Sequence, residues 1–198
     1  MRFLFVSAQL PGHLDWGGYL ETAAELQRLG HTVLWASGPA VAPLVVAQQV
    51  PFQPLQETGW RWPPPPPLQP TAEIAPDALQ RLRAERALDQ WLDEERVAQA
   101  CTELIALGRR YQPDLLVSEM FVSAAGLAAE ALSVPFVVAG WPATEPKVAA
   151  GQETLIALAR QRLERLCKRF SVTGVNWTSD GPPALLSPSL HLTYWSPT

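Results

Sequence analysis

The sequence is poor in cysteine and has no excess of positive charge, and each shortage excludes a class of function. Cys101 and Cys167 are the only cysteines, and neither forms a Cys-x-x-Cys motif or has a histidine nearby at ligand spacing. We therefore expect reduced, partly buried thiols and no metal site. Lysine and arginine total 15 against 19 acidic residues. Because nucleic-acid binding favours a basic face, we expect no nucleic-acid partner.

Long apolar runs are also absent. A transmembrane helix needs about 18 or more consecutive apolar residues, and the sequence contains no such stretch. Its first residues lead into a short apolar segment without the pattern of a cleavable signal. We therefore expect a cytoplasmic protein with no transmembrane segment. The 47% apolar and 17% charged residues are ordinary for a globular domain, and 198 residues suffice for one substantial core.

The first part of the chain has the pattern of a βαβ unit. Residues 3–6 are apolar and rich in β-forming types, which predicts a buried parallel strand. Apolar residues then recur at helical spacing from Gly18 to Gly30, where the glycine is suited to cap the helix, and residues 33–36 predict a second strand. An open sheet of such units binds its ligands in the loops after the strands, and His13 lies in the first of these loops.

A dinucleotide site is excluded by the positions of the glycines. That site needs Gly-x-Gly-x-x-Gly spacing and an acidic residue after the second strand. Gly12, Gly17 and Gly18 lack this spacing, and Ser37 follows the second strand. We expect no NAD, FAD or other cofactor. Gly17 and Gly18 could still form an anion site at the start of the helix, so a binding module for a phosphorylated ligand remains an alternative.

Proline dominates the middle of the chain. Five successive prolines follow Trp60, Arg61 and Trp62, and they exclude both a helix interior and a central strand. We expect an irregular, Pro/Trp-rich surface excursion over residues 56–75, more consistent with an ordered loop than with a docking ligand for another protein. Helical spacing then predicts one helical stretch from 76 to 108 and another over 151–170.

Several stretches together resemble a known family. They are Gly12-His13 after the first strand, Gly-His-x-Val within residues 28–33, residues 50–55 after a short helix, and residues 112–119 followed by a small-residue helix and an apolar strand at 134–138. In this order, over most of the chain, they resemble the amino-terminal half of a GT-B glycosyltransferase of the UDP-glycosyltransferase-like kind, which includes bacterial macrolide glycosyltransferases.

The resemblance implies both an architecture and an activity. The implied fold is α/β: a Rossmann-like open parallel sheet with helices on both faces, one half of a GT-B fold, with residues 1–198 as a single acceptor-binding domain and 191–194 as its last strand. The carboxy-terminal donor-binding domain, which would bind a UDP- or TDP-sugar, is then absent from this chain. We expect a hexosyltransferase as the full-length protein and an inactive chain by itself. A non-catalytic subunit of a two-chain glycosyltransferase is the alternative.

The resemblance also implies a catalytic pair. Inverting transfer to a hydroxyl needs a general base, and an imidazole with a pKa of about 6.5 suits that role near neutral pH. His13 matches the base of the family. Glu119 matches the carboxylate that orients this base, although the family more often has Asp there. His31, after a helix end, and His191, in the last strand, are expected to be structural.

Large aromatic residues near this pair predict a largely apolar small-molecule acceptor. Any one of the tryptophans could instead belong to the core, because Trp is highly buried on average. Asp15 could equally cap the first helix. The predicted acceptor contacts are Gly12, Asp15, Trp16, Trp60, Trp62, Phe121 and Trp141.

Overall fold

The described residues form an α/β fold around one parallel sheet. The computed structural model describes residues 1–14, 18–64, 66, 74–139, 151–178 and 183–192, without the side chain of His13. Within them, six strands pair in the order β3-β2-β1-β4-β5-β6, all parallel. This confirms the predicted Rossmann-like class. The strands are β1 (Arg2–Val6), β2 (Thr32–Ser37), β3 (Phe52–Pro54), β4 (Leu115–Ser118), β5 (Phe136–Ala139) and β6 (Leu190–Leu192).

Both faces of the sheet are buried, which explains the continuous apolar runs in its strands. Along β1, Leu4 and Val6 belong to one core cluster, and Phe3 and Phe5 belong to the other. All four are 7% exposed or less. A strand buried on both sides shows no alternation of polar and apolar residues, as is usual for parallel sheets.

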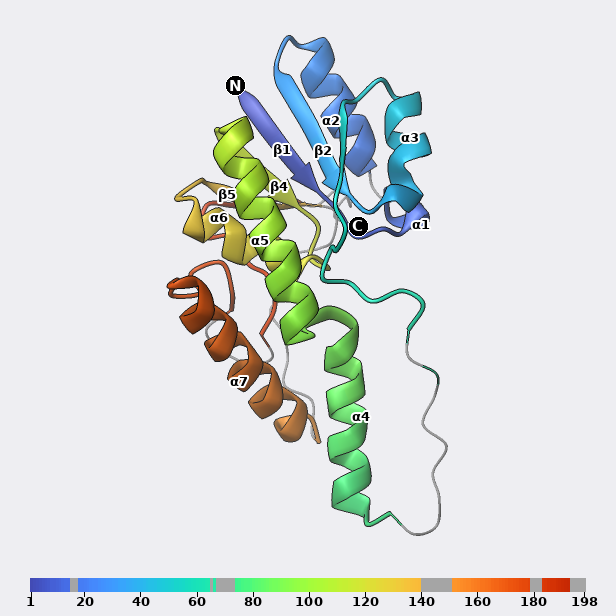
Figure 1. The fold of residues 1–198 in the computed structure, drawn as a ribbon, viewed down its shortest axis with the longest axis vertical. Coiled ribbons are helices and arrows are strands. Elements are labelled where there is room, and N and C mark those ends of the chain that lie inside the picture. The colour runs from blue at the N-terminus through green and yellow to red at the C-terminus, as the bar shows by residue number, and fades with distance from the viewer. Residues whose placement is uncertain (15–17, 65, 67–73, 140–150, 179–182, 193–198) are drawn as a thin grey trace, which may run out of the picture.

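Helices cover the two faces as expected. The face with Phe3 and Phe5 packs against residues of α2 (Tyr19–Arg28), the short 3-10 helix at Pro39–Val41 and α3 (Ala42–Ala47). The opposite face packs against further helices, which Figure 1 shows beside β4 and β5 and extending away from the sheet. These helices are α4 (Pro76–Trp91), α5 (Glu94–Tyr111), α6 (Ser123–Ala131) and α7 (Glu153–Phe170).

The expected single helical stretch from 76 to 108 is in fact two helices. Asp93 begins α5, because its side chain accepts hydrogen bonds from the backbone N–H groups of Glu95 and Arg96, both at 3.1 Å. Such an N-cap replaces the intrahelical partners that the first turn lacks. The periodicity of apolar residues continues across the break, which is why spacing alone did not reveal it.

Ion pairs join α7 to α4 and to α5. Helix α7 lies beside α4 at the end of the molecule away from the sheet (Figure 1). Arg162 of α7 contacts Asp89 of α4 at 2.7 Å, and Arg165 contacts Glu94 of α5 at 2.6 Å. Helices α4 and α7 form an arm. Its Arg165 pair is exposed and contributes little, whereas its Arg162 pair is partly buried, and apolar residues of both helices pack in the same core cluster.

Other differences from expectation are local. His13 belongs to a short helix, α1 (Pro11–Leu14), rather than to an irregular loop. Gly30 does follow the first long helix with a φ of 87°, a left-handed conformation that glycine adopts without strain, as the capping prediction required. The 56–75 excursion is described only in part, and its described residues form no helix or strand. Within the described residues, no helix is long and apolar enough to cross a membrane.

Candidate functional site

The topology brings the segments of the two predicted catalytic residues to one point of the sheet. Strand order reverses between β1 and β4, which are neighbours although more than a hundred residues separate them. Val6 pairs with Ser118 at their carboxyl ends. Open α/β sheets bind ligands in the crevice at such a reversal. The segment after β1 carries His13, and Glu119 directly follows β4.

Glu119 is buried and holds the start of the His13 segment. Its carboxylate is enclosed by protein, with the residue only 3% exposed. Its Oε1 atom accepts a hydrogen bond of 2.5 Å from the backbone N–H of Ala8. A buried carboxylate is costly without such partners. Glu119 is therefore built into the crevice and fastens the chain five residues before His13.

Ala8 is fastened from the other side as well. The Ser37 hydroxyl lies at the end of β2. It is 2.8 Å from the Ser7 carbonyl oxygen and 3.2 Å from the Ala8 carbonyl oxygen, and these two oxygens share its one proton. The indole N–H of Trp35 donates to the Ser7 hydroxyl at 3.1 Å. Side chains from β2 and from the residue that follows β4 thus hold the same short stretch. Such support pre-organises a functional group carried by the following residues.

Tyr19 fixes the first long helix to the same crevice. Its buried hydroxyl lies 2.8 Å from the Val6 carbonyl oxygen and 3.1 Å from the Val117 carbonyl oxygen. Its ring packs on Phe5 and Trp35 at centroid distances of 5.5 and 4.9 Å. The start of α2 is therefore tied to both strands at which the sheet order reverses.

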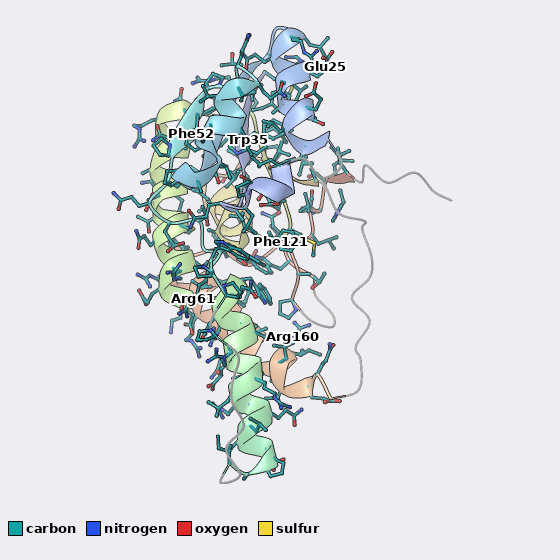
Figure 2. All side chains as sticks on the ribbon, turned by 90° about the vertical axis from the view of Figure 1, so that its right-hand side faces the viewer. Glu25, Trp35, Phe52, Arg61, Phe121 and Arg160 are labelled. Carbon is teal, nitrogen blue, oxygen red and sulfur yellow. The ribbon has the colours of Figure 1, made fainter. Side chains whose placement is uncertain are left out.

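Met120 and Phe121, the two residues that follow Glu119 in the chain, line an apolar pocket that we call the Trp60–Phe121 pocket. It has a volume of about 190 Å³. Trp60 and Phe121 meet edge to face in it, with ring centroids 5.0 Å apart. Figure 2 shows Phe121 between the part of the sheet that holds Trp35 and the arm that carries Arg160. The pocket has no charged lining residue; its lining is Trp60, Trp91, Met120, Phe121, Pro183, Ala184 and Leu185.

The predicted acceptor contacts are only partly brought together. Trp60 and Phe121, both predicted to contact the acceptor, share the pocket. Trp62 is 57% exposed and outside the pocket lining. Gly12 lies in α1, where its residue is exposed. Asp15, Trp16 and Trp141 lie outside the described residues.

Sequence reasoning missed most of the other pocket residues. Trp91 has helical spacing that favoured a core position, and it ends α4. Met120 follows Glu119 directly, which is a signal that could have been used. Leu185 and its two preceding residues come from the far end of the chain, and no local pattern connects them with Trp60.

The other two histidines and the two cysteines lie apart from the pocket lining. The His31 ring lies 5.3 Å from the Phe3 ring, at the end of α2, and His191 lies in β6. Burial raises the pKa of the Cys101 thiol to about 12. Burial, with the nearby charges of Glu130 and Glu164, raises the pKa of Cys167 to about 11. Both thiols are protonated near neutral pH. In the described part of the chain, no group of three or more His, Cys, Asp or Glu could hold a metal ion.

Comparison with solved structures shows which fold this is. The glycosyltransferase SsfS6 of Streptomyces sp. SF2575 aligns over 96% of this chain and 49% of its own, with a TM-score of 0.55 and 20% identity. SnogD from Streptomyces nogalater aligns over 98% and 44%, with a TM-score of 0.54 and 22% identity. The fold is that of half a GT-B glycosyltransferase. The spinosyn rhamnosyltransferase SpnG, complexed with thymidine diphosphate, aligns over 98% and 45%, with a TM-score of 0.59 and 21% identity.

This half-GT-B chain spans about half the length of the solved structures that it matches. No family model matches its sequence, and no curated protein matches it either. The structural matches confirm the predicted resemblance to antibiotic and macrolide glycosyltransferases at the level of the fold.

Proposed function

We propose that this chain is the acceptor-binding half of an inverting glycosyltransferase. The enzyme moves a hexose from a UDP- or TDP-sugar to a hydroxyl group of a largely apolar small molecule. One observation carries the proposal: in this half-GT-B sheet, the two residues that follow the buried Glu119, where the strand order reverses, line an uncharged aromatic pocket. The pocket supplies an apolar binding surface beside the segment that carries a base.

His13 acts as the general base in this proposal. As the acceptor oxygen attacks the anomeric carbon, its proton passes to the imidazole, and the bond from the sugar to the nucleoside diphosphate breaks with its electron pair on the leaving phosphate. Attack opposite to the leaving group inverts the anomeric centre. The Glu119 carboxylate stabilises the imidazolium that forms, in the manner of the acid in a hydrolase triad. The Ala8 hydrogen bond keeps this carboxylate beside the His13 segment.

A second half supplies the donor site. Two of the similar structures, SpnG and SsfS6, are complexes with thymidine diphosphate, and this chain spans about half of each. We infer that the nucleotide sugar binds to a second domain of a longer polypeptide or to a separate donor chain. Transfer takes place where the two halves face each other.

The test is an acceptor screen with the complete enzyme, this chain together with its donor half. UDP- and TDP-hexoses are offered with uncharged alicyclic and phenolic alcohols, and with carboxylate analogues of the same ring size as controls. We expect transfer to the uncharged alcohols, with an inverted anomeric centre seen by NMR. Transfer to the carboxylates or to free sugars in preference to the apolar alcohols contradicts the proposal.

A further inference from the structure

Leu185 lines the Trp60–Phe121 pocket and also packs against Gly126 of α6. Leu185 lines the pocket and is 4% exposed. Gly126 lies within α6, and a Cβ atom added to it would lie 2.5 Å from Cδ2 of Leu185. Real Cβ atoms do not approach other atoms so closely. Leu185 therefore occupies the space that any other residue at position 126 would need.

Space, rather than backbone conformation, is the reason for glycine at this position. Gly126 lies in the middle of a helix, where glycine is a poor former and alanine is the best. Its neighbours Ala124, Ala125, Ala128 and Ala129 all carry a Cβ and are fully buried. Alanine at position 126 would make this helix more stable if the position had room for a methyl group.

Hydrogen bonds fasten the backbone around Leu185 to α6. The Asn176 side-chain amide donates to the Gly126 carbonyl oxygen at 2.8 Å. Trp177 pairs with Leu185 as an antiparallel bridge, and the Leu186 N–H donates to the Asn176 carbonyl oxygen at 2.9 Å. With this segment fastened to the helix, a methyl group at position 126 displaces the end of the Leu185 side chain. Leu185 is also a lining residue of the pocket, so this displacement changes the pocket wall.

We propose that Gly126, acting through Leu185, sets the depth of the Trp60–Phe121 pocket and limits the buried part of the acceptor to one uncharged ring. The inference rests on the proposed function, because it takes this pocket as the acceptor site. The pocket volume is about 190 Å³. An apolar cavity of about 150 Å³ holds one benzene ring, whereas sites that enclose a whole drug-sized ligand measure about 300–1,000 Å³. A larger acceptor thus inserts one ring and leaves the rest outside.

The test measures binding of two probes to the 198-residue chain through tryptophan fluorescence, since Trp60 and Trp91 line the pocket. Cyclohexanol has one ring and decahydro-2-naphthol has two fused rings. We expect the wild type to bind cyclohexanol with the higher ligand efficiency. Leu185→Ala should strengthen binding of decahydro-2-naphthol at least about tenfold, because the fit of single methylene groups in a pocket already changes affinity by such factors. Gly126→Ala should weaken binding of cyclohexanol at least about tenfold for the same reason.

Two further variants make the result specific. The double variant Gly126→Ala, Leu185→Ala should recover binding of cyclohexanol, because the displaced side chain is gone. Leu186→Ala is the matched control, since it is the adjacent leucine, is 41% exposed and lies outside the pocket lining. It should leave both affinities unchanged. Circular dichroism verifies that each variant is folded.

The outcomes separate the two proposals. If cyclohexanol binds but folded Gly126→Ala and Leu185→Ala leave both affinities unchanged, the depth inference is overturned and the acceptor pocket stands. If cyclohexanol binds neither the wild type nor any variant, the apolar acceptor site fails and the depth inference fails with it. If Leu185→Ala does not fold, Gly126→Ala decides alone, because it removes no core side chain. Unchanged or stronger cyclohexanol binding in that variant then overturns the inference.

Discussion

At the scale of single residues, the reach of Glu119 matters as much as its charge. Its Oε1 atom contacts the Ala8 N–H at 2.5 Å. Because the family that the sequence resembles more often has aspartate at this position, a mild effect of Glu119→Asp would be expected. The structure revises that expectation, because aspartate is shorter by one methylene, about 1.5 Å of bond length. With the backbone unmoved, the shorter side chain falls short of the Ala8 N–H.

His13→Ala should remove most transfer activity of the complete enzyme. General-base assistance contributes roughly 10²–10⁴ in rate, so we expect kcat to fall within that range while donor affinity is unchanged. Steady-state kinetics and calorimetric titration of the nucleotide measure the two effects. A variant that keeps more than about a third of wild-type turnover, far outside this range, rules out His13 as the base.

Glu119 variants separate the charge from the backbone contact. Glu119→Gln keeps an oxygen that can accept from the Ala8 N–H but removes the charge that stabilises an imidazolium. We expect a large loss of kcat with a normal fold. Glu119→Asp keeps the charge and loses the contact, so the segment after β1 should exchange its amide hydrogens faster. Hydrogen exchange of residues 8–14 measures this, and equal protection in Glu119→Asp and the wild type would refute the fastening role.

At the scale of elements, the Glu130 carboxylate fastens residues 173–175, which follow α7, to α6. Glu130, in the last turn of α6, accepts from the Thr173 hydroxyl at 2.7 Å and from the backbone N–H groups of Thr173, Gly174 and Val175 at 2.6, 2.8 and 3.2 Å. Burial alone would raise the pKa of Glu130, but these hydrogen bonds outweigh it and lower the pKa. The ionised form therefore fits the folded chain best.

This lowered pKa predicts the direction of a pH dependence. Because the pKa of Glu130 is lower in the folded than in the unfolded chain, its contribution is complete above the unfolded value of about 4.3 and is lost as the pH falls through the folded value. Urea unfolding near neutral pH and in acid should show a steeper loss of stability for the wild type than for Glu130→Gln. Glu21→Gln, on the exposed side of α2, is the control and should follow the wild type.

The Asp93 cap at the start of α5 leads to a second prediction at this scale. Asp93→Ala should lower the free energy of unfolding by about 1 kcal/mol, because two backbone N–H groups lose their partner. Asp93→Asn should be nearly neutral, since asparagine caps helices as well as aspartate does. Urea denaturation of the three proteins measures the difference. Equal stability of Asp93→Ala and the wild type would show that the cap is not needed to begin α5.

At the scale of the whole molecule, the chain has what a domain needs to fold. Its sheet is buried on both faces by its own helices, and a domain with its own core can fold alone. We expect cooperative unfolding of the 198-residue chain and no appreciable binding of UDP or TDP, because the proposed function assigns the donor site to the other half. Calorimetric titration measures nucleotide binding. Tight binding of either nucleotide to this chain would contradict the proposal that the donor site lies in the other half.

The sequence by itself determined the order and type of most elements. Apolar runs in residues 3–6 and 33–36, helical spacing between them and the capping Gly30 depend on neighbours within one turn or one strand, and the structure confirms them. The position of Glu119 at the end of a strand was predictable for the same reason. Local patterns report which face of an element is apolar and where it ends.

Only the tertiary structure decided which distant segments meet. The contact of Glu119 with Ala8, the meeting of Trp60 with Phe121, and the place of Leu185 against Gly126 join segments that are far apart in the chain. Periodicity marks these residues as buried or aromatic but does not specify their partners, because partners depend on how whole elements pack at close range. The depth of the pocket is a property of that packing, and no single stretch of sequence contains it.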